Sequence, residues 1–326
     1  MFRNNELFNW FDSVRELPVP KFITGLRGTG KTSILLHLRE RLLEDGIPPD
    51  HLPYIDTEAS ELRAFATYEQ ILTHILTSLP RKGRSCIFIR EAAALPKSEI
   101  VIGTLAASAR RQVIATSSSR RLLDHGLAKY FSSRLAHFEV LPPDSEVPYP
   151  ADLARARWND IFLHDVLAPT RILETSLAER IAGWLSDNLG DPVSLRRIAT
   201  AISPTRRRLS PHTIESYLAS MEDAHLVEKV IRWDTAVAAP QKTGYRYFFT
   251  DPQLRLARFG PSPDGERRRM ALNRAWLRLK HAEGTVFAAS GTPGAHFVTQ
   301  SGKDHCLWHM TADGTLERQE FGRPPP

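Results

Sequence analysis

The sequence has few cysteines and no long apolar run. Its only two cysteines, Cys86 and Cys306, lie far apart in apolar, strand-like contexts. We therefore expect no structural disulfide, as is usual in a reducing compartment. No apolar run approaches the roughly 18 residues of a membrane-spanning helix, and the N-terminus lacks the pattern of a signal peptide. These absences predict a cytoplasmic protein with no membrane partner.

The composition is that of an ordinary soluble protein with an excess of positive charge. Hydrophobic residues make up 42% of the 326 positions and charged residues 25%, and the formal net charge is +6. A chain of this length can form about two or three domains. Arginines gather in two regions, 196–208 and 267–278. Such clusters indicate an anionic partner, most simply nucleic acid, or else a solvated face.

Short apolar segments alternate with helical patterns between about residues 20 and 141. Helical spacing is clear at Thr32–Leu43, where Ile34, Leu35, Leu38 and Leu42 share one side. The alternation predicts an α/β domain whose parallel sheet is covered by helices, with ligands at the carboxyl ends of the strands. The predicted strands are Lys21–Thr24, Leu52–Asp56, Ser85–Ile89, Gln112–Thr116 and Ala136–Leu141.

The proline-rich stretch LPPDSEVPYP at 141–150 indicates a domain boundary. Helices are then predicted at 151–166, 171–189, 194–202 and from Pro211, with Ser210 as the cap of the last. Strands follow at 227–233 and 245–250, so that helices leading into a hairpin give the pattern of a winged helix-turn-helix. The tail predicts a basic helix at 267–280 and short strands near 285–290, 296–300, 305–310 and 315–320.

The stretch GLRGTGKT at 25–32 matches the phosphate-binding motif G-x-x-x-x-G-K-[ST]. Gly25 and Gly30 allow backbone N–H groups to wrap phosphates, Lys31 reaches the β- and γ-phosphates, and the Thr32 hydroxyl suits Mg²⁺. The loop follows the apolar segment KFIT and opens a helix, which is the context that the motif requires. ATP and Mg²⁺ are therefore the predicted cofactors.

The run CIFIRE at 86–91 is placed as the strand that normally ends in a magnesium-binding aspartate. Arg90 stands where that aspartate belongs, whereas Glu91 can still serve as the base that polarises water. Three arrangements are open. Arg90 turns away into a salt bridge, it replaces the metal by contacting phosphate, or Asp56 or Glu58 takes over the metal. Weakened or absent hydrolysis is favoured over full activity, because a guanidinium near Mg²⁺ costs several kcal/mol.

Several pieces fall in the order of one known group. They are Arg27 within GLRGTGKT, REAAALP at 90–96, ATSSS at 115–119, SSRLAHFEVLP at 132–142, TIESYLASMEDAHLVEKVIRWD at 213–234 and YRYFFTDPQLRL at 245–256. With them, nearly the whole chain resembles the prokaryotic AAA+ ATPases that carry a winged helix-turn-helix and a C-terminal domain related to restriction-type nucleases.

The resemblance implies a P-loop AAA+ parallel-sheet domain at 1–142, a linker or lid helix at 143–170, a winged-helix domain at 171–250 and a small α+β domain at 251–326. It places Arg27, Gly28 and Thr29 in the nucleotide loop. It also makes Thr116 the sensor threonine and Arg134 the arginine finger. From the residues alone, either Thr116 or Ser117 is a candidate sensor of the γ-phosphate, and Arg134 is either a candidate arginine finger or one more surface arginine.

The tail departs from the nuclease pattern. His296, in GAHFV at 294–298, stands where the family has its catalytic aspartate, and the next strand HCLWHM has no Glu-x-Lys. A metal-dependent nuclease needs converging carboxylates. The tail is therefore interpreted as a catalytically inactive remnant or a binding module.

The winged-helix pattern leaves DNA and protein partners open. For DNA, Arg206, Arg207 and Arg208 would hold phosphates, and the helix from Pro211 would enter the major groove. Its exposed side chains are then expected to be His212, Thr213, Ser216 and Ser220. DNA is favoured because arginines precede that helix. An arginine finger acting in trans would require a homo-oligomer.

Three functions compete. The leading hypothesis is an ATP-dependent switch with weakened hydrolysis that engages DNA or a protein partner. The second is a pseudo-ATPase scaffold that binds nucleotide without hydrolysing it. A small P-loop kinase is weaker, because it leaves the winged helix unexplained.

Overall fold

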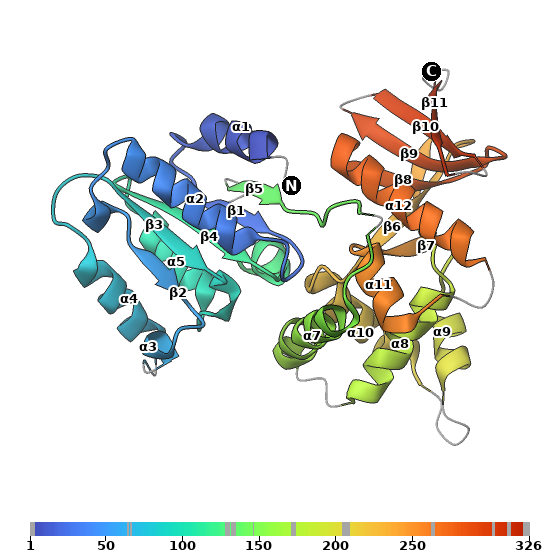
Figure 1. Cartoon of the computed structure of the whole chain (residues 1–326), viewed down its shortest axis with the longest axis horizontal. Coiled ribbons are helices and arrows are strands. Elements are labelled where there is room, and N and C mark those ends of the chain that lie inside the picture. The colour runs from blue at the N-terminus through green and yellow to red at the C-terminus, as the bar shows by residue number, and fades with distance from the viewer. Residues whose placement is uncertain are drawn as a thin grey trace. The chain divides into compact units, whose positions relative to one another are not determined.

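The computed structural model describes residues 4–63, 65, 67–127, 131, 135–145, 147–170, 174–203, 209–261, 265–301, 304–311 and 314–321. The chain divides into two compact units, an N-terminal unit Met1–Leu141 and a C-terminal unit Pro142–Pro326 (Figure 1). In the described part of the chain, no helix combines the length and the apolar character needed to cross a membrane. Cys86 and Cys306 are both free thiols.

The N-terminal unit is built on a five-stranded parallel sheet with the strand order β2-β3-β4-β1-β5. This sheet confirms the predicted α/β fold class. Its strands are β1 Lys21–Thr24, β2 Tyr54–Asp56, β3 Ser85–Arg90, β4 Arg111–Ser117 and β5 Ala136–Glu139. The helices are α1 Asn4–Val14, α2 Lys31–Glu44, α3 Ser60–Arg63, α4 Tyr68–Ser78 and α5 Ser98–Ala106, with shorter turns at Pro49–His51, Ala92–Ala94 and Leu122–Leu127.

Both faces of this sheet are apolar, because successive strand residues point to opposite sides. Phe22 packs in a cluster with residues of α4 and α5, whereas its neighbour Ile23 packs with residues of α1 and α2. Ile87 and Ile89 join the first cluster and Phe88 the second. The helices therefore cover both faces, and ligand access is left to the strand ends.

Only β1 has the predicted bounds in this sheet, and the differences in β2 and β3 bear on the site. β2 begins at Tyr54 rather than Leu52, since Pro53 has no N–H to donate to a neighbouring strand. β3 continues through Arg90, which pairs in register with Asp56 of β2. Arg90 thus belongs to the strand and lies beside an acidic residue at the carboxyl edge of the sheet.

The C-terminal unit combines helices with a six-stranded mixed sheet of order β11-β10-β9-β8-β6-β7. Its helices are α7 Ala151–Asp160, α8 Thr175–Asp187, α9 Leu195–Ile202, α10 Pro211–Asp223, α11 Pro252–Phe259 and α12 Glu266–Glu283, with further helical turns at Ile161–Leu167 and Ala168–Thr170. Its strands are β6 Val227–Asp234, β7 Ala239–Phe249, β8 Thr285–Ser290, β9 Ala295–Ser301, β10 Asp304–Met310 and β11 Leu316–Phe321.

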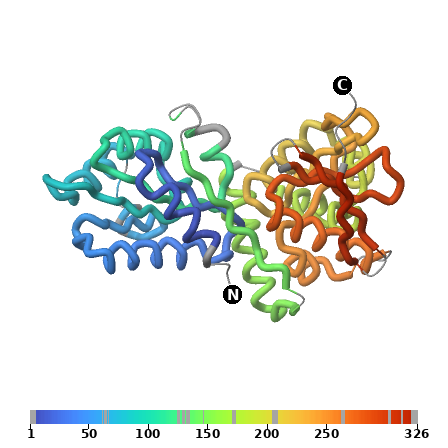
Figure 2. The backbone as a smooth tube through the Cα atoms, turned by 90° about the horizontal axis from the view of Figure 1, so that it is seen from above, coloured from blue at the N-terminus to red at the C-terminus, as the bar shows by residue number. Residues whose placement is uncertain are grey.

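The hairpin of β6 and β7 is continuous with the C-terminal strands, because β6 pairs in parallel with β8. Helix α12 is anchored to this sheet: the Asn273 amide both accepts from Phe249 N and donates to Phe249 O, and Trp276 stacks on Phe248. Figure 2 shows the orange helix and the red strands of this unit from above. Hydrogen bonds and ring packing therefore join residues on either side of position 250 in one body.

Candidate functional site

The phosphate-binding loop, residues 25–30, connects β1 to α2. Gly25, Gly28 and Gly30 have φ angles of 146°, 81° and 91°, a region that side chains with a Cβ rarely adopt. At Gly25 a Cβ would also lie 2.2 Å from Val140 O. The glycines of the motif are therefore required by the path of the backbone, which leaves N–H groups at the start of α2 for an anion.

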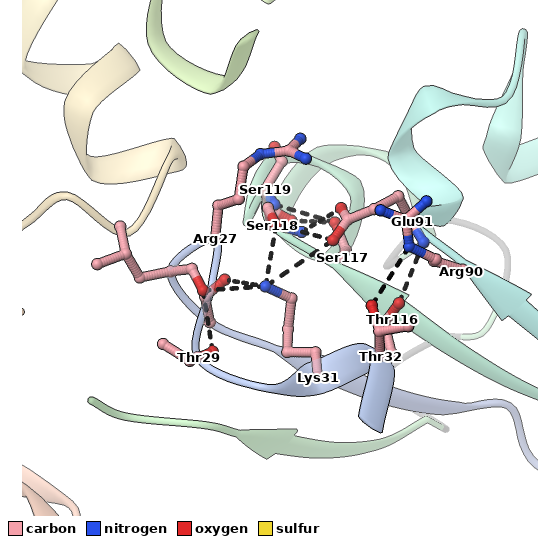
Figure 3. Close-up of polar contacts among 12 residues, drawn as sticks. Arg27, Thr29, Lys31, Thr32, Arg90, Glu91, Thr116, Ser117, Ser118 and Ser119 are labelled. Atoms are coloured by element: carbon pink, nitrogen blue, oxygen red, sulfur yellow. Dashed lines mark hydrogen bonds and ion pairs between the residues drawn. The ribbon is translucent and has the colours of Figure 1, made fainter. Parts of the chain in front are cut away.

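Lys31 folds back over this loop. Its side chain is only 4% exposed, and Nζ donates to Gly25 O over 2.8 Å, Leu26 O over 3.0 Å and Ser118 Oγ over 2.9 Å (Figure 3). The Thr29 hydroxyl also donates to Leu26 O. The ammonium therefore has oxygen partners that a phosphate can exchange, since a charged donor prefers an anionic acceptor.

Glu91 lies in the same hydrogen-bonded group. Its Oε2 accepts from Ser118 N and its Oε1 from Ser118 Oγ, each over 2.8 Å, and Oε1 is 3.8 Å from Lys31 Nζ. The Glu91 backbone N–H donates to Thr116 Oγ1 over 3.1 Å. Glu91 also has a left-handed φ of 50°, which is uncommon for a residue with a side chain and is found at functional turns.

Arg90 points to the opposite side of this turn, toward the start of α2. Its Nε donates to Thr32 Oγ1 over 3.3 Å, Nη1 to Asp56 Oδ1 over 2.7 Å, and Nη2 is 2.7 Å from Glu58 Oε2. Burial alone would lower the pKa of Arg90, but the hydrogen bond to Asp56 and the charge of Glu58 outweigh it and raise the pKa. Arg90 is therefore a permanent cation at this position.

Arg27 of the loop joins the same acidic pair. Its Nη1 is 3.1 Å from Glu58 Oε1, so that the two carboxylate oxygens of Glu58 hold one arginine each. Burial would raise the pKa of Glu58, but its hydrogen bond to Arg27 and the charges of Arg27 and Arg90 lower the pKa overall. The resemblance assigned Arg27 to the nucleotide loop, and in the structure it contacts an acidic partner.

The oxygens expected to hold Mg²⁺ are brought together but face Arg90. Mg²⁺ requires oxygen ligands at about 2.0–2.1 Å in octahedral geometry. The Thr32, Asp56 and Glu58 oxygens instead lie 2.7–3.3 Å from guanidinium nitrogens. A divalent ion among them would lie close to a unit positive charge, at a cost of several kcal/mol. The arrangement does not fit Mg²⁺.

Ser118 is the residue of this site that sequence reasoning missed. The stretch TSSS directed attention to Thr116 and Ser117, but Ser117 Oγ donates to Ser119 O and does not reach Glu91. Ser118 lies two positions beyond Thr116, and strand alternation places such residues on one side. The two-residue period of a strand was therefore the sequence feature that could have identified Ser118. Arg134, the predicted arginine finger, lies outside the described residues.

The predicted DNA-contacting residues are only partly described. Arg206, Arg207 and Arg208 fall outside the described ranges. On α10, His212 and Ser216 are exposed and Thr213 is half-buried. The expectation that Ser220 is exposed is wrong: Ser220 is 1% exposed and its hydroxyl bonds to Val166 O. The helix turns this position inward, next to the buried Met221.

Part of the second arginine cluster is paired within the C-terminal unit. Arg274 Nε and Arg278 Nε donate to the two oxygens of Asp144 over 2.7 and 2.5 Å, and Arg269 Nη2 is 3.6 Å from Asp191. The two Asp144 contacts attach the segment before α7 to α12. These arginines therefore have a structural use that requires no external anion.

His296, which stands where the family has its catalytic aspartate, lies on β9. Its Nδ1 accepts from Met310 N over 3.1 Å, and burial together with the charges of Arg268 and Arg246 lowers the pKa of His296. Across the described ranges, no group of three or more His, Cys, Asp and Glu side chains has the arrangement of a metal site.

The comparison with family models concerns mainly the N-terminal unit. Residues 18–146 match the family model described as an AAA domain. The matched stretch contains the phosphate-binding loop and all five strands of the parallel sheet of order β2-β3-β4-β1-β5. Over 276 residues the chain is also 22% identical to an uncharacterized protein of Haemophilus influenzae, and the match covers 74% of this chain and 69% of that protein.

Several solved structures match at low similarity. Drosophila ORC bound to AT-rich DNA and Cdc6 has a TM-score of 0.30 and 12% identity over 78% of this chain and 90% of that chain. For C. elegans PCH-2 the TM-score is 0.32, with 14% identity over 67% of this chain and 68% of that one. A DNA replication initiation factor has a TM-score of 0.31 and 15% identity, covering 68% and 89%.

Proposed function

We propose that the chain binds ATP in the phosphate-binding loop and uses it as a conformational switch, with weakened hydrolysis. The observation that carries this proposal is the link through Ser118. Its hydroxyl accepts from Lys31 and donates to Glu91, so one side chain connects the phosphate-binding lysine to the candidate base. A change in the hydrogen bonds of Lys31 therefore alters the hydrogen bonds of Glu91.

The switch follows from an exchange of hydrogen bonds. When phosphates enter the loop, Lys31 Nζ gives up the carbonyls of Gly25 and Leu26 and the hydroxyl of Ser118. Phosphate oxygens are the stronger partners because both groups are charged. Ser118 then loses one partner, and Glu91 loses the nearby ammonium that stabilised its position. Thr116, which holds the Glu91 backbone, transmits the change to β4.

Hydrolysis is weakened because Arg90 stands in the place of the metal-binding aspartate. In P-loop enzymes the metal neutralises charge that develops on the phosphates. Here the oxygens of Thr32, Asp56 and Glu58 interact with Arg90. The same contacts favour the second candidate, a pseudo-ATPase scaffold that holds nucleotide without turnover.

The C-terminal unit supplies the surface for a partner. Helices α8, α9 and α10 and the hairpin of β6 and β7 have the order of a winged helix-turn-helix. His212 and Ser216 are exposed on α10, and Arg206–Arg208 precede that helix in the sequence. These features support DNA as the partner through major-groove and phosphate contacts, with a protein partner as the alternative. Binding of the partner would then depend on whether nucleotide is bound in the N-terminal unit.

The test measures ATP binding and turnover together for the wild type, Lys31→Ala and Arg90→Asp. Lys31→Ala should weaken ATP binding by about tenfold or more, since it removes a charged hydrogen-bond donor to phosphate. Lys82→Ala, which removes an exposed lysine of the same unit, should bind normally. A wild type that shows no ATP binding would rule out the proposed function.

Turnover separates the two candidates. Slow turnover by the wild type that is lost in Lys31→Ala supports the switch. Binding without turnover, with turnover gained in Arg90→Asp, supports the scaffold instead.

A further inference from the structure

The backbone of Arg90 is held by hydrogen bonds, as its guanidinium is. The Thr57 hydroxyl donates to Arg90 O over 2.9 Å and to Glu91 O over 2.8 Å, which ties the end of β2 to the end of β3. Asp56 Oδ1 also accepts from Glu58 N over 3.0 Å, so the two acids are fixed relative to each other. The position of Arg90 therefore follows from a built arrangement of two adjacent strand ends.

The oxygens that hold Arg90 are the kind that usually surround a hard divalent cation. A threonine hydroxyl and two carboxylates contact one planar cation on three of its nitrogens. Carboxylate and hydroxyl oxygens are the ligands that Mg²⁺ prefers. The guanidinium therefore satisfies the acids that a metal would otherwise satisfy, and it does so as a fixed part of the chain.

This guanidinium retains capacity for a phosphate. An arginine has five N–H donors in a planar fork, and the three contacts to Thr32, Asp56 and Glu58 use one N–H each. Two N–H groups are thus left without a bond to any described residue of the site. Thr32 is also the first-turn residue of α2, next to Lys31 of the phosphate-binding loop. Arginine suits phosphate oxygens because its fork can make paired, charge-assisted bonds.

We propose that Arg90 is the resident cation of the nucleotide site and replaces the divalent metal, so that the chain binds ATP as the free anion without Mg²⁺. This inference rests on the proposed nucleotide binding. Asp56 and Glu58 act as positioning residues that hold the guanidinium beside Thr32. The ligand class is a nucleoside triphosphate whose phosphates contact Lys31 and Arg90 directly.

The experiment measures equilibrium binding of ATP to the full chain in excess EDTA and in Mg²⁺. The wild-type Kd should change by less than about fivefold between the two conditions, because Arg90 supplies the positive charge in both. Arg90→Met should weaken binding in EDTA by about tenfold or more. Arg84→Met, which removes an arginine that is 76% exposed and lies just before β3, is the matched control and should bind like the wild type.

Arg90→Asp gives the converse result, because it supplies an oxygen ligand where the cation stood. Its ATP binding should require Mg²⁺ and weaken by about tenfold or more in EDTA. Circular dichroism and thermal unfolding check that each variant is folded. The wild-type comparison needs no variant, so a folding defect in Arg90→Met or Arg90→Asp leaves the test intact.

The outcomes distinguish the two proposals. One outcome is that the wild type binds ATP in Mg²⁺ and loses about fivefold or more of its affinity in EDTA. That result overturns the role of Arg90 and leaves nucleotide binding intact. Equal binding of folded Arg90→Met and wild type in EDTA also overturns it. Absence of ATP binding in both conditions overturns the proposed function itself.

Discussion

Ser118 binds both carboxylate oxygens of Glu91, with its backbone N–H on Oε2 and its hydroxyl on Oε1, each over 2.8 Å. The same hydroxyl accepts from Lys31 Nζ over 2.9 Å. The candidate base is therefore held in place by the residue that also holds the phosphate-binding lysine. The proposed nucleotide binding would exchange some of the bonds that hold this site together, so each side chain of the site can be tested separately.

Ser118→Ala removes the hydroxyl and keeps the backbone bond to Glu91. Lys31 then loses one of the partners that it must give up to phosphate, so ATP should bind about two- to fivefold more tightly, the equivalent of one net hydrogen bond of about 0.5–1 kcal/mol. Equilibrium titration with ATP measures this. Ser119→Ala is the matched control, because the Ser119 hydroxyl accepts from Arg121 N rather than bonding to Lys31 or Glu91. Unchanged or weaker binding in Ser118→Ala would contradict the exchange.

Gly25→Ala should destabilise the N-terminal unit strongly. A Cβ at this position would meet Val140 O at 2.2 Å on a backbone with φ of 146°. We expect a loss of about 3 kcal/mol or more in the free energy of unfolding. Gly46→Ala is the control, since Gly46 has φ of 86° but nothing within 4 Å of the added atom, and it should cost about 1–2 kcal/mol. Urea unfolding compares the two, and equal losses would argue against the steric cause.

Glu58→Gln should lower stability in a pH-dependent way. Although burial opposes it, Arg27 and Arg90 lower the pKa of Glu58 below its ordinary value of 4.5. A lowered pKa means that the folded protein gains stability above the unfolded pKa and loses it as the pH falls through the folded pKa. The difference between wild type and Glu58→Gln should therefore be greatest near neutral pH and shrink below about pH 4.

Urea unfolding at several pH values measures this difference. Glu40→Gln removes an exposed glutamate of α2 and serves as the control, with little effect at any pH. A difference for Glu58→Gln that stays constant from neutral to acidic pH would show that its charge is not what stabilises the fold.

DNA binding, if it uses the arginines before α10, should weaken steeply as salt rises. Each phosphate contact contributes about 0.9 to the slope of log K against log salt, so changing Arg206, Arg207 and Arg208 to Ala should lower the slope by up to about 2.7. The control changes Arg81, Lys82 and Arg84, an exposed basic group of the N-terminal unit. Measuring binding to duplex DNA at several salt concentrations tests this prediction. A flat salt response would exclude phosphate contacts.

Much of the fold could be predicted because local patterns suffice for it. The strand Lys21–Thr24 and the segment Thr285–Ser290 have the bounds that alternation predicts. The caps are equally local: Ser194 and Ser210 accept from the N–H groups of Arg197 and Thr213 as expected of N-caps. Helix α11, Pro252–Phe259, was not predicted, although the sequence offers local signals for it: Asp251 caps its start and Pro252 occupies its first turn.

The amino-acid sequence by itself determined the phosphate-binding loop and the exceptional arginine, since both depend on residue type at fixed spacing. It left three arrangements open for Arg90 and gave no reason to choose Ser118. Only tertiary structure decided these. The register of β2 against β3 sets Asp56 beside Arg90, and the ends of β3 and β4 bring Glu91 to Ser118. These contacts span 34 and 27 positions of the chain, and local sequence patterns hold no information on side chains so far apart.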